Sequence, residues 1–212
     1  MYNLDPYIRD ATVFPIRLPL KEAEVFYYPN FLTSEIADLY YQILFKEINW
    51  QQDSITVFGK TYPQPRLTAL YGLEGKAYTY SGITMLPIPF NKVLKEIKEK
   101  IQKVTKENFT TVLLNLYRNG SDSNGWHSDN EKELGKNPCI ASVSFGADRF
   151  FQFKNKKEKS TTYKLSLTHG SLLVMGGKTQ HYWLHQLPKT TLVNTPRINL
   201  TFRKILSKNC IQ

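Results

Sequence analysis

Apolar residues recur at helical spacing in two stretches of the chain. In residues 33–48 they fall on one face, and Thr33 or Ser34 can cap the N-terminus of the resulting helix. In residues 91–107 they lie beneath an outer face rich in lysine, which is typical of a solvated surface. We therefore expect two amphipathic helices. Their predicted apolar faces comprise Ile36, Leu39, Tyr40, Ile43 and Leu44 in the first helix and Val93, Leu94, Ile97, Ile101 and Val104 in the second.

After residue 108 the pattern changes to short runs of strand-forming residues. These runs are rich in β-branched and aromatic side chains, and turn-forming stretches such as "NGSDSNG" separate them. Many short strands, with the helices confined to the first half of the chain, predict an α+β fold built on a β-sandwich or jelly roll. A wound parallel sheet is not expected. The predicted strands are residues 110–118, 140–145, 149–154, 162–167, 171–176 and 197–205.

The composition fits a globular protein with a sizeable core. Of the 212 residues, 41% are apolar and 13% are aromatic, which suits one domain. No stretch of about 18 residues is continuously apolar, and the N-terminus lacks the pattern of a secretory signal. Two cysteines, Cys139 and Cys210, are too few for a disulfide framework, and we expect Cys139 to be reduced and buried. We expect a soluble protein of a bacterial cytoplasm or of a eukaryotic nucleus or cytosol, with no membrane partner.

The charge of the chain is strongly positive. Its formal net charge at pH 7 is +10. A basic balance of this size favours an anionic partner, with nucleic acid as the first candidate. Many basic proteins bind no nucleic acid, so the charge does not establish such a partner by itself.

The stretch "NGWHSDNE" places a histidine and a carboxylate two residues apart. If His127 and Asp129 lie on a strand, their side chains project from the same face and can converge on one point. Two histidines and one carboxylate with open positions form the facial triad of non-haem Fe(II) oxygenases. A surface histidine paired with a neighbouring aspartate would leave the same pattern, so a third ligand is needed.

Three other histidines are available as that third ligand. His169 precedes Gly170 in what should be a tight turn, which favours a structural role. His181 and His185 are four residues apart and share a face in either a helix or a strand. The residues alone leave the choice between these two open.

The stretch "RINLTFR" has an unusual alternation for a buried strand. Its arginines at the two ends lie about 20 Å apart, and their side chains can reach inward to leave space for a short diacid. Arginine can hold a carboxylate through two N–H groups, so anion capture is one interpretation. Two surface arginines on an edge strand are the alternative. As a strand, it would present Arg197, Asn199, Thr201 and Arg203 on one face and Ile198, Leu200 and Phe202 on the other.

These motifs together resemble the AlkB family of Fe(II)/2-oxoglutarate dioxygenases. The order and spacing of "NLYRNG", "WHSDNE", "ASVSFGADRFFQF", "HYWLHQLP" and "PRINLTFRKI" carry the resemblance, which covers roughly residues 55–205 and is closest to the branch containing the animal nuclear DNA-repair homologues. It implies a double-stranded β-helix, or jelly roll, with flanking N-terminal helices and a nucleotide-recognition lid. We expect one domain over residues 1–212, with the helical flank, a finger hairpin and the lid in about 1–90 and the catalytic core in about 91–212.

The resemblance also implies cofactors and the residues that hold them. Fe(II) would be the metal, and 2-oxoglutarate and O₂ the co-substrates. The implied iron ligands are His127, Asp129 and His185, because the family's distal histidine sits just before an x-x-Pro turn. The positions that match the family's 2-oxoglutarate-binding residues are Asn115, Tyr117, Arg197, Thr201 and Arg203.

Residues 55–66 read as a hairpin with Phe58 near its tip. This phenylalanine could fold into the core, but the resemblance implies a finger whose aromatic residue enters a duplex where a base has been flipped out. Two tyrosines of the lid would contact the flipped base by stacking. The full set of implied substrate residues is Phe58, Gly59, Lys60, Arg66, Tyr78, Tyr80, Asn130 and Glu131.

Some of these positions depart from the pattern expected of near relatives. We expect an acidic residue where Asn130 stands and a phenylalanine where Tyr80 stands, so the base preference does not follow from the resemblance. Lys60 and Arg66 would lie near phosphates, and Glu131 could favour a cationic base.

The function implied by the resemblance is oxidative demethylation of bases such as N1-methyladenine and N3-methylcytosine in DNA, with release of formaldehyde, succinate and CO₂. Duplex DNA is the expected partner, and a monomer the expected state. The alternatives are the same chemistry on RNA, hydroxylation of a protein or a small molecule, and non-catalytic binding of damaged nucleic acid.

Overall fold

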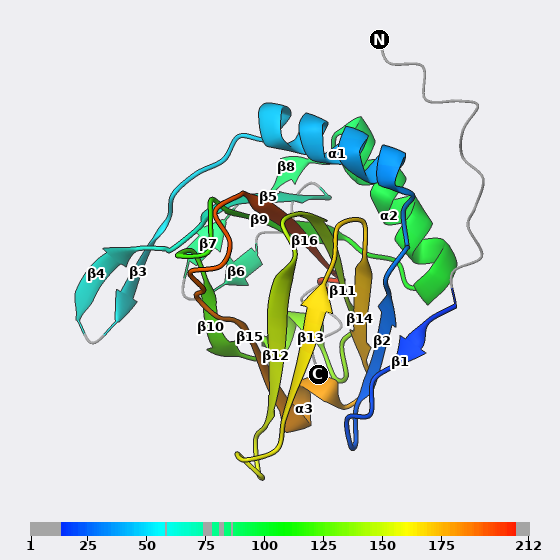
Figure 1. Ribbon diagram of the computed structural model, residues 1–212, viewed down its shortest axis with the longest axis vertical. Helices are drawn as coiled ribbons and strands as arrows, with labels where there is room; N and C mark the ends of the chain where they lie inside the picture. The colour runs from blue at the N-terminus through cyan, green and yellow to red at the C-terminus, as the bar shows by residue number, and fades with distance from the viewer. Residues whose placement is uncertain (1–13, 58, 74–77, 81–82, 86, 207–212) are drawn as a thin grey trace.

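The computed structural model contains one large sheet and one smaller sheet (Figure 1). It describes residues 14–57, 59–73, 78–80, 83–85 and 87–206. The large sheet has the strand order β1-β2-β14-β11-β16-β9-β5-β8, and its neighbouring strands are antiparallel except for the parallel pair β5–β8. Its strands are β1 Ile16–Arg17, β2 Glu24–Tyr28, β14 Leu172–Gly176, β11 Ile140–Gly146, β16 Arg197–Arg203, β9 Thr111–Tyr117, β5 Leu67–Gly72 and β8 Ile88–Pro89.

The smaller sheet is antiparallel and has the order β10-β15-β12-β13. Two separate hairpins, β3–β4 and β6–β7, precede it in the chain, and β3–β4 extends away from both sheets (Figure 1). The strands of the smaller sheet are β10 Asn124–His127, β15 Trp183–Leu187, β12 Arg149–Asn155 and β13 Thr162–Leu167. Those of the hairpins are β3 Ser54–Val57, β4 Lys60–Pro63, β6 Tyr78–Tyr80 and β7 Ile83–Met85.

Two long helices cover one face of the large sheet. Asn91 caps the second of them, since its Oδ1 accepts a 2.9 Å hydrogen bond from the Leu94 N–H. Thr33 occupies the N-cap position of the first helix without a side-chain capping bond. No helix in the described part of the chain is long and apolar enough to span a membrane. The helices are α1 Ser34–Glu47, α2 Lys92–Thr105, the short α3 Thr179–Tyr182 and the 3-10 helix η1 Lys132–Leu134.

Strand β16 shows how the sequence pattern divides the interior into two layers. Its apolar residues Ile198, Leu200 and Phe202 pack into the core beneath α1 and α2. Its polar residues face the opposite way, into the space between the two sheets. A second core, which includes Phe153 and Trp183, fills the rest of that space. The alternation predicted for this strand is therefore confirmed, and β16 lies centrally between β11 and β9 rather than at an edge.

Several element predictions need correction. Val104 was expected on the buried face of α2, but it is 40% exposed because the helix ends just after it, at Thr105. On α1 the fully buried small residue is Ala37, which the apolar pattern left out. Two short helical segments, α3 and η1, lie in the second half of the chain, where no helix was predicted. Cys139 is only partly buried, because it directly precedes β11.

Candidate metal and co-substrate site

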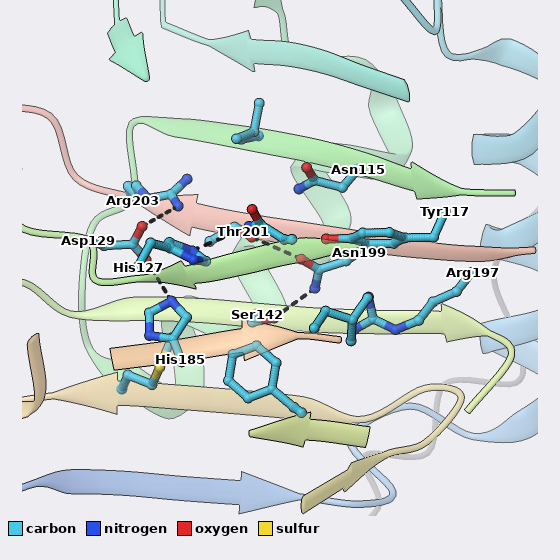
Figure 2. Close-up of a pocket in the computed structure, with 15 residues that line it drawn as sticks. Asn115, Tyr117, His127, Asp129, Ser142, His185, Arg197, Asn199, Thr201 and Arg203 are labelled. Atoms are coloured by element: carbon cyan, nitrogen blue, oxygen red, sulfur yellow. Dashed lines mark hydrogen bonds and ion pairs between the residues drawn. The ribbon is translucent and has the colours of Figure 1, made fainter. Parts of the chain in front are cut away.

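The three residues predicted to bind iron meet between the two sheets (Figure 2). His127 ends β10, and His185 lies directly opposite it on β15, with ring centroids 4.3 Å apart. Asp129 follows β10, and its Oδ2 lies 3.9 Å from Nε2 of His185. One ligand atom from each of the three residues lies within 4.8 Å of the others. The convergence is as predicted, but the reason is different: Asp129 is beyond the strand, so the chain after β10 brings it there rather than strand pleating.

The donor atoms of this cluster suit a divalent metal. Nδ1 of His127 lies 2.7 Å from the carbonyl oxygen of Gly125, so Nδ1 carries the proton and Nε2 keeps its lone pair for a ligand. Nε2 of His185 lies 3.9 Å from Oδ2 of Asp129, so this nitrogen points into the cluster. Two neutral imidazoles and one carboxylate are the donor set of non-haem Fe(II) sites.

The charges around the cluster favour metal-binding protonation states. Burial raises the pKa of Asp129, but the Arg203 guanidinium and then the two histidines lower it to about 2. Burial, followed by repulsion from His127, lowers the pKa of His185 to about 3. Burial also lowers the pKa of His127. Near neutral pH the carboxylate is therefore ionised and both imidazoles are neutral, as metal ligation requires.

The residues predicted to hold 2-oxoglutarate line the same cavity as the metal cluster. The free volume of this cavity is about 40 Å³ in the present side-chain arrangement. Its polar wall comes from β9 and β16, which are neighbours in the large sheet. The predicted residues found on this wall are Asn115, Tyr117, Arg197, Thr201 and Arg203.

The two arginines of β16 occupy different surroundings in the cavity. Arg203 lies at the metal end, where its Nη2 donates a 2.8 Å hydrogen bond to Oδ1 of Asp129. Arg197 lies toward the other end, 5.4 Å from the centre of the Tyr117 ring, and donates to the Ser144 hydroxyl at 2.9 Å. Burial lowers the pKa of Arg197 to about 10, so it is still a cation near neutral pH. Arg203 thus binds the candidate metal ligand Asp129 directly, a contact that the sequence did not predict.

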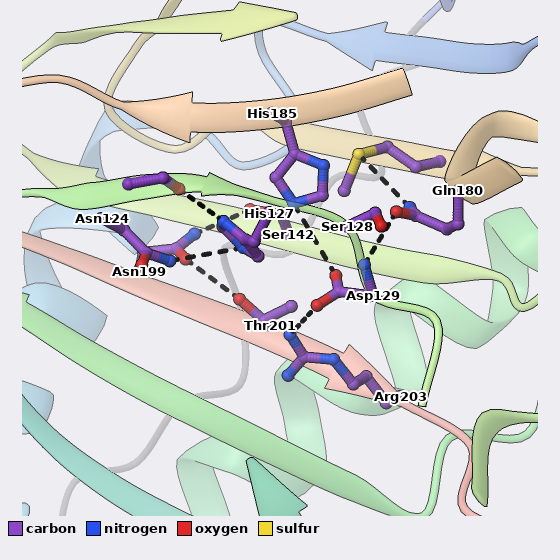
Figure 3. Close-up of polar contacts among 12 residues, drawn as sticks. Asn124, His127, Ser128, Asp129, Ser142, Gln180, His185, Asn199, Thr201 and Arg203 are labelled. Atoms are coloured by element: carbon purple, nitrogen blue, oxygen red, sulfur yellow. Dashed lines mark hydrogen bonds and ion pairs between the residues drawn. The ribbon is translucent and has the colours of Figure 1, made fainter. Parts of the chain in front are cut away.

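Sequence reasoning assigned no role to several polar residues of the site. Asn199 lies on the predicted polar face of β16, and its Nδ2 donates to the Ser142 hydroxyl at 2.7 Å while its Oδ1 accepts from Thr201 at 3.0 Å. Strand alternation pointed to Asn199, but nothing in the sequence pairs it with Ser142, which lies on the neighbouring strand β11. Gln180, from α3, accepts a 3.0 Å hydrogen bond from the Asp129 N–H and had no sequence signal at all (Figure 3).

Arg66 does not take the position expected for a phosphate contact. It is only 5% exposed, and its Nε donates a 2.8 Å hydrogen bond to Oδ1 of Asn115. A second bond runs from its Nη1 to the Ser123 carbonyl at 3.3 Å. This arginine therefore orients a residue of the co-substrate wall, because it points into the protein rather than toward the surface.

The remaining histidines lie outside the cluster. His181 is exposed, and its Nε2 lies 2.8 Å from Oδ1 of Asn137. His169 lies in a turn, as predicted, and its Nδ1 accepts a 2.8 Å hydrogen bond from the Gly146 N–H.

The implied substrate residues are only partly described. The β3–β4 hairpin is present as predicted, with Gly59 at φ +74 and Lys60 exposed next to its turn. Phe58 itself lies outside the described residues. For Tyr78 and Tyr80 the structure describes only the backbone of β6, which pairs with β7.

Two further implied substrate residues follow the metal ligand Asp129. Asn130 is exposed, and Glu131 is half-buried. Neither is among the described residues that line the cavity.

Comparisons with known proteins agree with this geometry. The model of the 2OG-Fe(II) oxygenase superfamily matches residues 24–203. Alpha-ketoglutarate-dependent dioxygenase alkB homolog 3 of Homo sapiens is 43% identical over 203 residues, which cover 91% of this chain and 70% of that protein. DNA oxidative demethylase ALKBH2 of Homo sapiens is 43% identical over 180 residues, which cover 80% of this chain and 69% of that protein.

A solved structure shares the fold. The structure of OsALKBH1 has a TM-score of 0.59 and 18% sequence identity, and the match covers 85% of this chain and 96% of that one. It is consistent with a jelly-roll oxygenase architecture. The matched family model and the two relatives show that the chain belongs to the AlkB family of Fe(II)- and 2-oxoglutarate-dependent dioxygenases.

Proposed function

We propose that this chain removes N-methyl groups oxidatively from bases in DNA, with N1-methyladenine and N3-methylcytosine as substrates. The observation that carries the proposal is the cluster of His127, Asp129 and His185 beside the polar wall that contains the residues predicted to bind 2-oxoglutarate. One relative is named a DNA oxidative demethylase, and the net charge of +10 suits a polyanionic substrate.

The metal would be held by the His127 and His185 rings and the Asp129 carboxylate. When bound, Fe(II) with O₂ and 2-oxoglutarate supplies the oxidising chemistry, which converts the co-substrate to succinate and CO₂ and releases the methyl carbon as formaldehyde. The protein contributes placement. The Arg203 contact keeps the Asp129 carboxylate ionised.

The far end of the cavity would hold the distal carboxylate of 2-oxoglutarate. Arg197 is a buried cation there, with Tyr117 and Asn115 on the neighbouring strand β9. A guanidinium in a buried site binds a carboxylate more strongly and with more defined geometry than it would in water. The separation of Arg197 from the metal cluster gives the co-substrate one orientation, with its keto-acid end toward the metal.

We further propose duplex DNA as the preferred substrate. The β3–β4 hairpin projects away from the sheets (Figure 1), and in the sequence Phe58 stands between its two strands. An apolar wedge is useful in a duplex, because it fills the gap left by a flipped base, and a single strand needs none. Lys60, exposed on the same hairpin, is available to a phosphate. We also propose that residues 1–212 act as one domain and as a monomer, inside the cell where DNA is present.

The decisive experiment measures formaldehyde release from a methylated duplex oligonucleotide. We expect release that requires Fe(II) and 2-oxoglutarate and that is absent in His127→Ala. Release without either addition, or undiminished release by the variant, would refute the proposed site. Binding of methylated DNA with no turnover under these conditions would instead support a non-catalytic binder.

The strandedness of the substrate is tested separately. We expect Phe58→Ala to lose activity on duplex oligonucleotides and to keep it on single strands of the same sequence. Equal loss on both, or higher activity of the unmodified chain on RNA than on DNA, would contradict the duplex DNA proposal while leaving the chemistry intact.

A role for Glu131 in preferring cationic bases is part of this proposal. A carboxylate near the pocket would attract N1-methyladenine, which carries a positive charge, over a neutral methylated base. Glu131→Gln should therefore reduce the ratio of activities on cationic and neutral substrates. An unchanged ratio would remove Glu131 from the account.

A further inference from the structure

Asp129 lies in a stretch of chain that no strand or helix holds in place. Strand β10 ends at His127, and the next element, η1, begins at Lys132. The backbone of Asp129 is nevertheless tied to the protein, because its N–H donates a 3.0 Å hydrogen bond to Oε1 of Gln180. Gln180 is 1% exposed and belongs to α3, far away in sequence. The bond is therefore a tertiary contact on the backbone of a candidate metal ligand.

The orientation of the Gln180 amide is determined by its two neighbours. An N–H group can only donate, so the amide oxygen must face Asp129. The NH₂ end then faces Sδ of Met175, at 3.9 Å, which is a weak acceptor. The side chain thus presents one acceptor, and no charge, to the loop that carries the carboxylate.

Lys156 joins the same two segments through its ammonium group. Its Nζ donates to the carbonyl oxygen of Gln180 at 2.7 Å and to the hydroxyl of Ser128 at 2.9 Å. Ser128 directly precedes Asp129, so the lysine connects α3 to the residue next to the ligand. The lysine is itself anchored by its backbone N–H, which donates to the Tyr182 carbonyl at 2.8 Å.

Asp129 is consequently held from two sides. Arg203 binds its carboxylate through Oδ1, and Gln180 with Lys156 fixes the backbone of the loop (Figure 3). With the backbone and one carboxylate oxygen both fixed, Oδ2 is left directed at His185, 3.9 Å from Nε2. A side-chain rotation alone cannot provide this geometry, because the loop backbone would remain free to move.

We propose that Gln180 and Lys156 are positioning residues for the metal site, which act by holding the loop that carries Asp129. The inference rests on the proposed role of Asp129 as a metal ligand. Neither residue belongs to the His127, Asp129 and His185 cluster, so each would affect the metal only by holding Asp129 in place. Removal of a group that orients a metal ligand commonly weakens metal binding by about 10- to 100-fold.

The test uses Co(II) as the probe, because its visible absorption reports coordination geometry without turnover. Gln180→Met keeps the size of the side chain and removes the acceptor, and we expect Co(II) to bind about 10-fold or more weakly with an altered spectrum. Gln180→Glu retains an oxygen at the same place and should restore most of the affinity. Lys156→Met should weaken Co(II) binding less than Gln180→Met does. Lys164→Met is the matched control, since Lys164 is exposed and its ammonium lies 3.6 Å from the centre of the Phe150 ring, and this variant should bind Co(II) normally.

The outcomes separate positioning from general stability. If Gln180→Met is folded by near-ultraviolet circular dichroism and binds Co(II) with normal affinity and spectrum, the inference is wrong. If that variant does not fold, Lys156→Met decides, and normal Co(II) binding by Lys156→Met refutes the inference. If the unmodified chain binds no Co(II), both the proposed metal site and this inference fail. If the unmodified chain binds Co(II) and Gln180→Met and Lys156→Met bind it equally well, the proposed metal site is supported and the positioning role is refuted.

Discussion

Nη2 of Arg203 donates a 2.8 Å hydrogen bond to Oδ1 of Asp129, and both side chains are almost completely buried. Arg197, at the start of the same strand, binds Ser144 toward the other end of the cavity. Strand β16 therefore links the candidate metal centre to the candidate co-substrate site through one continuous backbone. Since β16 is paired on both sides, the backbone of neither arginine can shift without disturbing the large sheet.

Removal of Arg203 should destabilise the protein strongly. In Arg203→Met the Asp129 carboxylate stays buried without its cationic partner, and we expect the free energy of unfolding to fall by about 3 kcal/mol. Urea unfolding of the metal-free protein at neutral pH measures this change. Lys92→Met is the control, because Lys92 is exposed and its Nζ lies 4.0 Å from Oε1 of Glu96, and loss of this pair should cost about 0.5 kcal/mol or less. Similar losses in the two variants would contradict the expectation.

The size of that difference should depend on pH through Asp129. Burial raises the pKa of this group, but Arg203 and then the histidines lower it from 3.8 to about 2. A carboxyl group with a lowered pKa stabilises the fold above its unfolded pKa, and this contribution is lost as the pH falls through the folded value. The difference in unfolding free energy between the unmodified chain and Arg203→Met should therefore be constant near neutral pH and shrink below about pH 4. A difference that stays constant down to pH 3 would be inconsistent with this assignment.

Metal binding should resist mild acid more than two ordinary histidines would allow. Burial lowers the pKa values of His127 and His185, that of His185 to about 3. A lowered pKa means that the neutral ring, the form that binds a metal, persists below the usual value of 6.5. We expect the Co(II) affinity to be nearly unchanged between about pH 7.5 and 6.5. Calorimetric titration measures it, and a tenfold loss across that interval would show ordinary histidine titration.

Binding of 2-oxoglutarate should depend on the geometry of Arg197 and not only on its charge. Arg197→Lys keeps a cation but loses the planar pair of donors, and we expect affinity for 2-oxoglutarate to fall about 10- to 100-fold. The matched control, Arg17→Lys, alters an exposed arginine and should have no effect. Anaerobic calorimetry with Mn(II) in place of iron measures both. Unchanged affinity in Arg197→Lys would exclude Arg197 as the diacid contact.

Arg66 offers a sharp distinction between an internal and a phosphate-binding role. Because its Nε binds Oδ1 of Asn115, Arg66→Met should free that amide and raise the KM for 2-oxoglutarate about tenfold. DNA affinity and its salt dependence should not change. Lys60→Met should do the opposite, with weaker DNA binding, a salt slope smaller by about one and an unaltered KM. If Arg66→Met reduces the salt slope instead, the phosphate role first expected for it is correct.

The local sequence pattern predicted several helices and strands, but it did not predict which of them pack against one another. The period of apolar residues located both long helices to within a residue or two, and the alternation in "RINLTFR" separated the faces of β16. Strand β15 contains a candidate metal ligand and was not predicted, because "WLHQL" is short and its half-buried face carries both an apolar residue, Leu184, and a polar one, Gln186. Val104 shows a similar failure at the end of a helix: the apolar spacing of the sequence includes it, but it does not pack into the core.

The site was recognised through its ligands, whereas the groups that orient them were missed. His127, Asp129 and His185 were identifiable because their types and spacing match a known donor set and a known family. Gln180 and Lys156 carry no motif, since an amide that accepts one backbone hydrogen bond can stand anywhere in a sequence. Arg66 was expected near phosphates as part of the substrate set implied by the resemblance, but in the folded chain it is buried and binds Asn115.

The sequence by itself determined the two long helices, about half of the strands, the polar face of β16 and, through its resemblance to a known family, the candidate metal ligands. These features depend on interactions between residues close in the chain, or on a combination of residue types that is uncommon outside metal sites. The tertiary structure decided that Asp129 lies beyond its strand, that Arg203 serves the metal ligand and that Gln180 holds the loop. Each of these depends on contacts between segments far apart in the chain, and such contacts are set by how the two sheets pack, which no local pattern encodes.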